Sequence, residues 1–291
     1  MKTMMMTTTT TSNEIGRLAL ESMLIEVSVT PKPGLVDRNN SGAHRDMGFF
    51  TFMRSAASLH SCFQEFAESG VIAGINNIAL SKFFTNIRKI GIRAEENMFA
   101  ATQGINTHKG EIFSLGLLSA SAGYLIGSKR LVNSDSVMKL AGKICSGLCE
   151  QDFRDARNKD YDSLTNGERI YLEHGITGIR GEAESGYQTV RNISLPALRK
   201  YLSEGLSLND ALAFTLIHII AYSQDTNIIS RHNINIAKEV MNTCKSLLEG
   251  NNLSIQKLYE LDEDFIARNI SPGGSGDLLA VTYFLYMLDI I

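Results

Sequence analysis

The 291-residue sequence has no tryptophan and only four prolines. Proline interrupts helix interiors, so its scarcity favours a chain that is mostly helical. Cysteine is also scarce, and the four residues form neither a paired C-x-x-C array nor a zinc spacing with histidine: Cys62, Cys145, Cys149 and Cys244. We interpret them as unpaired thiols of a protein in a reducing compartment.

Excess charge and long apolar runs are missing as well. The formal net charge is −3, and a general nucleic-acid binder would carry a basic surface. The longest apolar runs, 211–222 and 278–291, are shorter than the 18 to 20 or so residues of a membrane span and are interpreted as buried core helices. The Met- and Thr-rich start lacks the apolar core of a signal peptide, so residues 1–12 are predicted to be a disordered tail. We therefore expect a cytoplasmic protein without nucleic-acid or membrane partners, and the sequence leaves a homodimer open.

The apolar residues that are present recur at helical spacing. Ile15, Leu18, Ser22, Ile25 and Val29 lie on one helix face, which ends at the T-P-K-P-G segment of residues 30–34. Similar patterns predict helices over 49–66, 83–101, 111–126, 137–149, 195–202, 208–222, 234–248 and 262–268. Small residues at 116, 120 and 123 predict a close approach of two helices. The sequence thus predicts an all-α fold, with one multi-helix catalytic domain over residues 13–291 and few strands.

Five polar, glycine-bearing segments separate these helices, at 30–46, 106–110, 174–186, 225–227 and 271–277. Binding and catalytic residues concentrate in such loops, so five of them indicate a shared polar site at the helix ends.

Two of these segments suit phosphate. The glycine-rich turn at 271–277 feeds a helix and could bind phosphate with its backbone N–H groups, or Ser275 or Asp277 could simply cap that helix. Lys109 could act as a point charge on a phosphate, or it could be a solvated lysine in a turn.

The other segments carry carboxylates. Asp37 and Asp46, in one loop with His44, have the oxygen-rich neighbours that Mg²⁺ accepts, although solvated loop charges give the same pattern. Glu182 and Glu184 follow Arg180, and burial together would raise the pKa of one of the two carboxyls. Asp225 and Asn227 could be metal ligands or a helix turn.

Together these segments resemble one family, the triphosphoribosyl-dephospho-CoA synthases that serve citrate lyase and malonate decarboxylase. The matching stretches are T-P-K-P-G-L-V-D-R at 30–38, G-A-H-R-D-M at 42–47, N-T-H-K-G at 106–110, G-I-R-G-E-A-E at 178–184, D-T-N at 225–227 and S-P-G-G-S at 271–275. The citrate lyase branch is the more similar of the two. The sequence departs from the family where His232-Asn233 replaces a usual Gly-Gly, which puts the role of Arg231 in doubt, and where Gly276 replaces Ala.

The resemblance implies an all-α transferase that moves the triphosphoribosyl group of ATP to 3′-dephospho-CoA with Mg²⁺, releasing adenine. The product would be the precursor of a prosthetic group that a separate transferase attaches to the acyl carrier subunit of citrate lyase. Catalytic roles are expected for Glu182 as base, for Glu184 and Arg180 as residues that tune it, and for His44 or His108 as the acid on adenine. Phosphate or substrate binding is expected for Lys32, Arg38, Asn106, Thr107, Lys109, Gly110, Asn227, Arg231, Ser271, Gly273, Gly274 and Ser275, and magnesium binding for Asp37, Asp46, Asp225 and Asp277.

Two other functions fit the same residues. A Mg²⁺-dependent nucleotide phosphohydrolase of helical fold would release phosphate or ribose triphosphate without dephospho-CoA. A helical regulator without catalytic activity would bind ATP and release no adenine.

Overall fold

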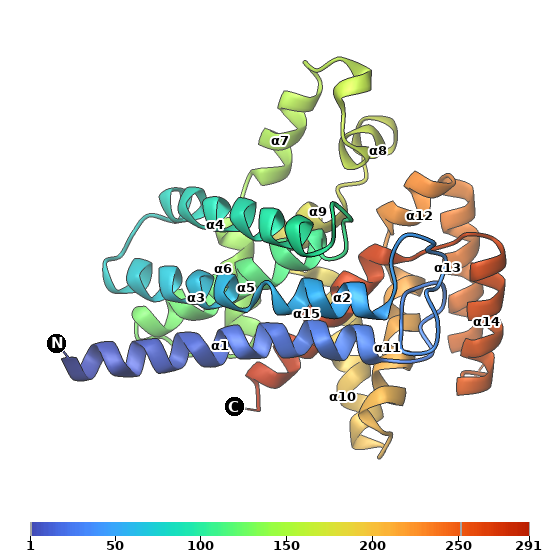
Figure 1. The fold of residues 1–291 in the computed structure, drawn as a ribbon, viewed down its shortest axis with the longest axis horizontal. Helices are drawn as coiled ribbons and strands as arrows, with labels where there is room; N and C mark the ends of the chain where they lie inside the picture. Colours follow the sequence, from blue (N-terminus) through green and yellow to red (C-terminus); the bar gives the residue numbers. More distant parts are fainter. Residues whose placement is uncertain (1, 251, 291) are drawn as a thin grey trace. The chain divides into compact units, whose positions relative to one another are not determined.

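Helices make up the ordered secondary structure of the chain. The computed structural model describes residues 2–250 and 252–290, which contain fifteen α-helices, one 3-10 helix and one π-helix, and no strand (Figure 1). The predicted all-α fold is confirmed.

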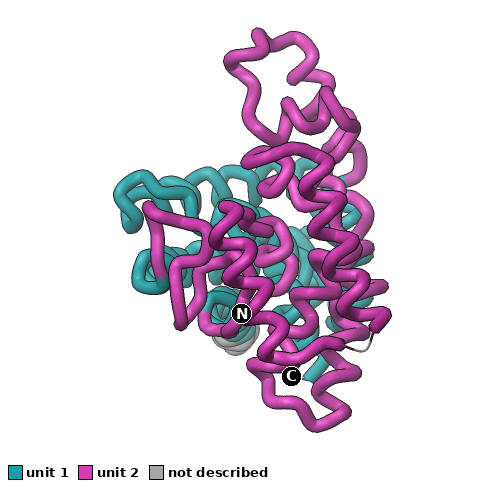
Figure 2. Tube along the Cα trace, turned by 90° about the vertical axis from the view of Figure 1, so that its right-hand side faces the viewer, with its two compact units in different colours: residues 1–27, 49–145, 280–291 teal, residues 28–48, 146–279 magenta. Residues whose placement is uncertain are grey.

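The helices form two compact units, which Figure 2 shows in teal and magenta. Unit 1 comprises Met1–Val27, Phe49–Cys145 and Ala280–Ile291, and unit 2 comprises Ser28–Gly48 and Ser146–Leu279. One catalytic domain over residues 13–291 stays a prediction.

Unit 1 is built around a tightly packed pair of helices, α3 and α5. Its helices are α1 (Lys2–Ser28), α2 (Phe49–Ala57), α3 (His60–Ile75), α4 (Leu80–Ala101), α5 (Lys109–Gly127), α6 (Ser134–Ile144) and the second half of α15 (Gly273–Leu288). A Cβ on Gly70 would lie 2.1 Å from the Ala120 carbonyl oxygen, and one on Gly123 would lie 2.1 Å from that of Ala67. Glycines four residues further on, Gly74 and Gly127, meet carbonyls in the same way. The predicted close approach is confirmed, because only glycine lets the two backbones meet at this distance.

Helix α1 starts earlier than the sequence predicted. It begins at Lys2 and therefore includes residues 2–12, for which we predicted a disordered tail, while Met1 lies outside the described residues. The physical reason is the absence of any proline or glycine before Gly16 that would stop the helix from extending toward the N-terminus. Its other end, at Ser28 before Pro31, is where the prolines predicted it.

One helix among the described residues meets the length and composition of a membrane span, which corrects the expectation that no apolar run is long enough. This helix is α5, with 19 residues and a mean hydropathy of 1.2. Its apolar window is 72% buried within the structure, as in a helix that forms a protein core. The run was overlooked because Lys109 and Glu111 stand at its start and serines interrupt it.

Unit 2 has α11 as its central buried helix, with α10 and α13 packed against it. The elements of this unit are α7 (Leu148–Ala156), η1 (Tyr161–Ser163), α8 (Asn166–His174), α9 (Gly178–Glu184), the π-helix η2 (Val190–Ser194), α10 (Leu195–Ser203), α11 (Leu208–Tyr222), α12 (Thr226–Arg231), α13 (Ile234–Glu249), α14 (Ile255–Ala267) and the start of α15. The prediction that residues 211–222 form a core helix is confirmed.

Three predicted boundaries are wrong. The helix over 49–66 is split between α2 and α3, the helix over 137–149 ends at Ile144, and the loop over 174–186 contains helix α9. Helix α9 was not predicted because it contains glycines, which usually indicate a loop. A Cβ on Gly181 would lie 1.8 Å from Thr177 Oγ1, so this helix needs glycine there for packing.

The packing of α3 on α5 yields a stability prediction. Gly123→Ala should destabilise the protein, because overpacking costs about 1–3 kcal/mol and alanine regains only about 1 kcal/mol of helix propensity. Gly91→Ala in α4 is the matched control, since its Cβ would meet only the Phe66 ring at 3.8 Å. That control should be neutral or up to about 1 kcal/mol more stable in urea unfolding. Equal stability of the two variants would contradict the close packing.

Candidate active site

The loop before α2 is folded around Asp37. One carboxylate oxygen accepts hydrogen bonds from the backbone N–H groups of Asn39 (2.6 Å) and Asn40 (2.9 Å). The other accepts from Thr30 Oγ1 (2.7 Å) and the backbone N–H of Lys32 (3.1 Å). A carboxylate has about four lone-pair positions, so these four donors saturate Asp37.

A second buried carboxylate, Asp262 of α14, ties the same loop to the C-terminal part of unit 2. Its oxygens accept from the backbone N–H of Gly34 (2.9 Å) and from Asn40 Nδ2 (2.7 Å). Gly34 has φ +72°, and a Cβ there would lie 2.2 Å from the Ile270 carbonyl oxygen. Burial raises the pKa of Asp262. Asp262 was not predicted, because nothing in an ordinary helix pattern marks it.

Asp225 joins the starts of two helices. One of its oxygens accepts from the backbone N–H groups of Asn227 (2.9 Å) and Ile228 (3.4 Å) in the first turn of α12. The other accepts from the backbone N–H (2.7 Å) and the hydroxyl (2.9 Å) of Ser275 in the first turn of α15. Burial raises the pKa of Asp225, and these four donors oppose that shift. The carboxylate therefore takes the place at the start of α15 where we had considered a phosphate.

These contacts do not fit a magnesium site made of Asp37, Asp46, Asp225 and Asp277. Asp37 and Asp225 have no free lone pair, Asp46 is an exposed loop residue, and Asp277 is half-buried in the second turn of α15. Among the residues that the structure describes, no group of three or more His, Cys, Asp or Glu is placed to hold a metal ion. Asp37 and Asp225 act instead as acceptors for backbone N–H groups.

Arg231, at the end of α12, lies in a cluster with residues from two of the predicted segments, 30–46 and 271–277. Its Nη1 donates to the Ala43 carbonyl (3.0 Å) and to Asn269 Oδ1 (3.2 Å). Its Nη2 lies 3.0 Å from His44 Nδ1, and His44 Nε2 lies 2.9 Å from Ser271 Oγ. The structure thus brings together Arg231, His44 and Ser271, whereas one polar site shared by all five segments stays a prediction. Asn269 was not predicted.

The protonation state of His44 does not fit its expected role as the acid that protonates adenine. Burial, and next the positive charge of Arg231, lower its pKa to about 4, while Asp46, 3.9 Å away, raises it. At neutral pH the ring is uncharged and accepts a hydrogen bond from Arg231. An imidazole in this state has no imidazolium proton to give to a leaving group.

Glu182 is a half-buried carboxylate in α9. It accepts hydrogen bonds from the backbone N–H and the hydroxyl of Thr189, just before the π-helix η2. Burial raises the pKa of Glu182, and the two hydrogen bonds from Thr189 lower it less. A carboxyl with a raised pKa is a better base, so its environment suits the expected role.

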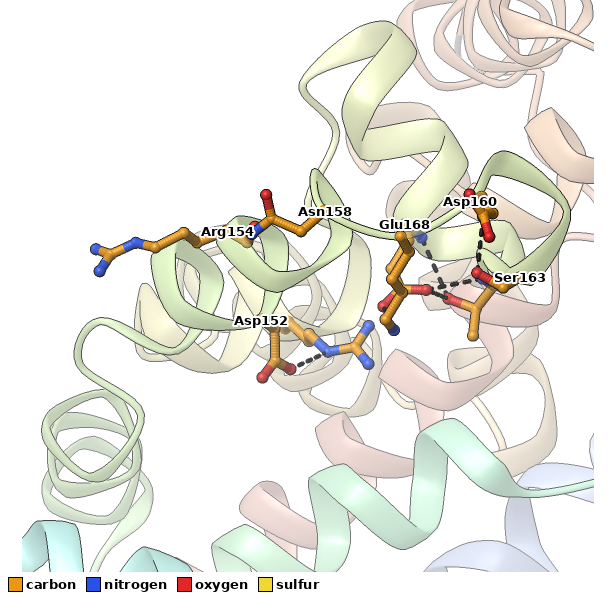
Figure 3. A network of polar contacts seen from close by, with 9 residues as sticks. Asp152, Arg154, Asn158, Asp160, Ser163 and Glu168 are labelled. Atoms are coloured by element: carbon orange, nitrogen blue, oxygen red, sulfur yellow. Dashed lines mark hydrogen bonds and ion pairs between the residues drawn. The ribbon is translucent and has the colours of Figure 1, made fainter.

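Glu184 and Arg180 have partners other than Glu182. Glu184 accepts from the backbone N–H groups of Gly147 (2.6 Å) and Cys149 (3.1 Å) at the start of α7. Burial would raise the pKa of Glu184, but hydrogen bonds from Cys149 and Gly147 outweigh it and lower the value. Arg180 Nε donates to Asp152 at 2.9 Å, and Figure 3 shows Asp152 on α7 in this network. The expected tuning of Glu182 by these two residues has no support in the contacts.

The segment at 106–110 lies in unit 1. His108 is fully buried, with its Nδ1 2.6 Å from Ser55 Oγ, and Thr107 Oγ1 donates to the same hydroxyl at 2.7 Å. Lys109 forms a 3.0 Å ion pair with Glu95, and the Asn106 side chain accepts from its backbone N–H. Gly110 lies in the first turn of α5, where these contacts order the start of the helix.

Four more predicted residues belong to unit 2. Arg38 Nη2 donates to Asn209 Oδ1 at 3.1 Å, and a Cβ on Gly273 would lie 2.8 Å from Asn227 Nδ2. A Cβ on Gly274 would lie 3.3 Å from an Asp225 carboxylate oxygen, so both glycines permit the start of α15 to approach α12. The Lys32 side chain is almost completely buried.

Asp225→Asn tests whether this carboxylate is a helix cap. Asparagine still caps α12, but its amide cannot accept from Ser275, so a buried donor loses its partner at a cost of about 1–3 kcal/mol. We expect this loss of unfolding free energy in EDTA and in magnesium alike, with Asp46→Asn as an exposed control. A loss that occurs only when magnesium is present would show that Asp225 is a metal ligand instead.

The whole sequence is similar to one family of transferases. The model of the family described as ATP:dephospho-CoA triphosphoribosyl transferase matches residues 12–290. The 2-(5″-triphosphoribosyl)-3′-dephosphocoenzyme-A synthase of Pectobacterium atrosepticum is 39% identical over 273 residues, covering 94% of this chain and 88% of the relative. A Pectobacterium carotovorum protein proposed to be the same enzyme is 40% identical with the same coverage.

A crystal structure from Archaeoglobus fulgidus, of a protein proposed to be a triphosphoribosyl-dephospho-CoA synthase, is also similar. It covers 81% of this chain and 98% of its own, at 18% identity and a TM-score of 0.48. The assignment rests on the sequence matches alone. With a family model that matches 279 of the 291 residues (12 to 290), the chain belongs to the family of ATP:dephospho-CoA triphosphoribosyl transferases.

Proposed function

We propose that this transferase moves the 5-triphosphoribosyl group of ATP to the ribose 2′-hydroxyl of 3′-dephospho-CoA and releases adenine. The single observation that carries the proposal is the family match over residues 12–290, with relatives at about 40% identity. The product is the precursor of the citrate lyase prosthetic group. A separate transferase would then attach it to the acyl carrier subunit.

The reaction makes three demands on the protein. The bond between C1′ of the ATP ribose and N9 of adenine breaks, and a bond from C1′ to the acceptor oxygen forms. By analogy with glycoside chemistry, the transition state resembles an oxocarbenium ion. The protein must hold the triphosphate, take the proton of the acceptor hydroxyl and stabilise the positive charge that develops on the sugar.

We assign Glu182 to two of these demands, uptake of the hydroxyl proton and stabilisation of the positive charge on the sugar. Its carboxylate receives hydrogen bonds only from Thr189 among the described residues, so each oxygen retains a lone pair for the substrate. Its raised pKa favours uptake of the hydroxyl proton. Asp37 and Asp225 are saturated by their own donors and are unsuited to this role.

For the triphosphate, the chain offers cationic side chains and backbone N–H groups. Arg231 and Arg38 lie in unit 2 and bind neutral acceptors, which leaves their charge uncompensated. Lys109, in unit 1, shares its charge with Glu95, and a phosphate would have to compete with that carboxylate. The roles of Lys32, Asn106, Thr107 and Asn227 stay predictions.

Magnesium also stays a prediction. ATP carries its own phosphate ligands for a divalent cation, and Mg²⁺ commonly keeps waters and takes few protein carboxylates. Because the aspartates of unit 2 do not form a ligand set, we derive no step through the metal. The cytoplasm is the expected location, in agreement with four free cysteines.

The assay that tests this function uses purified protein with ATP, dephospho-CoA and magnesium, and follows adenine and CoA-derived products by mass spectrometry. We expect equal amounts of adenine and of a triphosphoribosyl adduct, both dependent on dephospho-CoA. Phosphate or ribose triphosphate formed without an adduct would indicate a nucleotide hydrolase. ATP binding without any adenine would indicate a regulator.

Glu182→Gln should lower kcat by about 10²- to 10⁴-fold, the usual contribution of a general base, while leaving the fold intact. The wild-type acid limb of kcat against pH should lie above the ordinary pKa of 4.5, because burial raises the pKa of Glu182. Glu173→Gln, an exposed glutamate of α8, is the matched control and should retain wild-type kcat. A folded Glu182→Gln enzyme with the wild-type rate and acid limb would remove Glu182 from the mechanism.

A further inference from the structure

Arg231 is held at three points although its side chain remains exposed. Both protons of Nη1 are directed at acceptors, the carbonyl of Ala43 and the amide oxygen of Asn269. Nη2 donates to Nδ1 of His44. A guanidinium has five N–H donors, so Nε–H and one Nη2–H have no acceptor among the residues that the structure describes.

All three acceptors of Arg231 are neutral. The other arginines of unit 2 that form ion pairs among the described residues face carboxylates: Arg154 faces Glu150, Arg180 faces Asp152, and Arg268 faces Glu239 and Asp264. No carboxylate oxygen of the described residues lies within ion-pair distance of Arg231, and exposed Asp46 lies nearer to His44. The guanidinium is therefore fixed in direction by neutral groups, and exposed Asp46 acts on it only from beyond ion-pair distance, which leaves it able to bind an anion.

His44 supplies one of the three acceptors because it is uncharged. Its Nδ1 can accept from Arg231 only without a proton, so the proton resides on Nε2 and is donated to Ser271 Oγ. The 3.4 Å approach of Arg231 Nη2 to Nε2 is then not a hydrogen bond, since that nitrogen has no free lone pair. Ser271 thereby fixes the tautomer of His44, and His44 fixes the guanidinium.

His232 and Asn233, the two residues after Arg231, support the same cluster. His232 Nε2 lies 3.0 Å from the carbonyl oxygen of Asn269, the residue whose side chain holds Arg231. Asn233 accepts from the backbone N–H groups of Asn235 and Ile236 and so caps α13. Neither residue has a positive φ, so the turn after Arg231 does not need glycine.

We propose that Arg231 is a phosphate-binding residue presented by a cradle of Ala43, His44 and Asn269, and that His44 is a positioning residue for the guanidinium. The ligand is a phosphate group of ATP or of dephospho-CoA. This identity rests on the proposed function, whereas the existence of an anion site at Arg231 does not.

Calorimetric binding of inorganic tripolyphosphate to the full chain tests the anion site without any turnover. Arg231→Gln should weaken binding by about tenfold or more, because a charge-assisted hydrogen bond is lost. Arg268→Gln is the matched control arginine and should bind as the wild type does. Unchanged binding in Arg231→Gln, or no binding to the wild type at millimolar concentrations, would overturn the proposal independently of the adenine assay.

Two variants of His44 test the positioning role. His44→Asn places an amide oxygen near the position of Nδ1 and should keep tripolyphosphate binding within about twofold of wild type, whereas His44→Phe keeps the ring volume and should weaken it about three- to tenfold. In turnover, His44→Phe should raise KM more than it lowers kcat. A kcat loss shared by both variants with unchanged KM would show that His44 acts chemically.

The KM values of Arg231→Gln for the two substrates then identify which substrate's phosphate Arg231 binds. If Arg231 holds the triphosphate, Arg231→Gln raises KM for ATP and leaves KM for dephospho-CoA near the wild-type value. If it holds the diphosphate of the acceptor, the two effects are reversed. An increase in neither value would contradict a substrate phosphate at Arg231.

Discussion

The hydrogen bonds of the Asp225 carboxylate are the constraint on which the polar part of unit 2 depends. One side chain satisfies the first N–H groups of α12 and of α15, two helix starts that lie far apart in sequence, at Thr226 and Gly273. A helix start attracts negative charge, and here the protein itself supplies that charge. A substrate phosphate at the same N–H groups would have to displace a buried carboxylate, so the cation that meets phosphate has to come from elsewhere.

The hydrogen bonds of Asp225 also determine where Arg231 lies. It ends the short helix that Asp225 begins, so the position of the cap sets the position of the guanidinium. The loop that supplies Ala43 and His44 is fixed by two more carboxylates, Asp37 and Asp262. Three buried acidic residues thus order the backbone on both sides of the arginine, while none of them lies close enough to neutralise it.

The sequence predicted the fold class and most helix ends because its signals there are local. Two prolines follow α1, and Pro272 stands immediately before α15, whose first turn contains the glycines that were predicted as a turn. Helix α9 was not predicted, because glycine disfavours helix, and here Gly181 is required by contact with the Thr177 side chain one turn earlier. Of the five predicted segments, 30–46 and 225–227 each contact 271–277, through His44 with Ser271 and Asp225 with Ser275, and the shared site of all five stays a prediction. The contacts do not support the assignment of Asp37 and Asp225 to a metal, since the number of donors around a carboxylate depends on the folded backbone. Asp262 and Asn269 have no motif signal and were missed.

How strongly an arginine attracts an anion depends as much on the charge of its hydrogen-bond acceptors as on its own pKa. A carboxylate partner would orient Arg231 equally well, yet it would offset most of the attraction for phosphate and would have to be displaced or left unpaired on binding. A carbonyl, an amide and a neutral imidazole orient the group without that penalty. The imidazole can serve in this way only while it is unprotonated, and burial beside Arg231 lowers the pKa of His44 to about 4, well below neutral pH. The arginine and the histidine therefore stabilise each other's functional state: the cation keeps the ring neutral, and the neutral ring leaves the cation free for an anion.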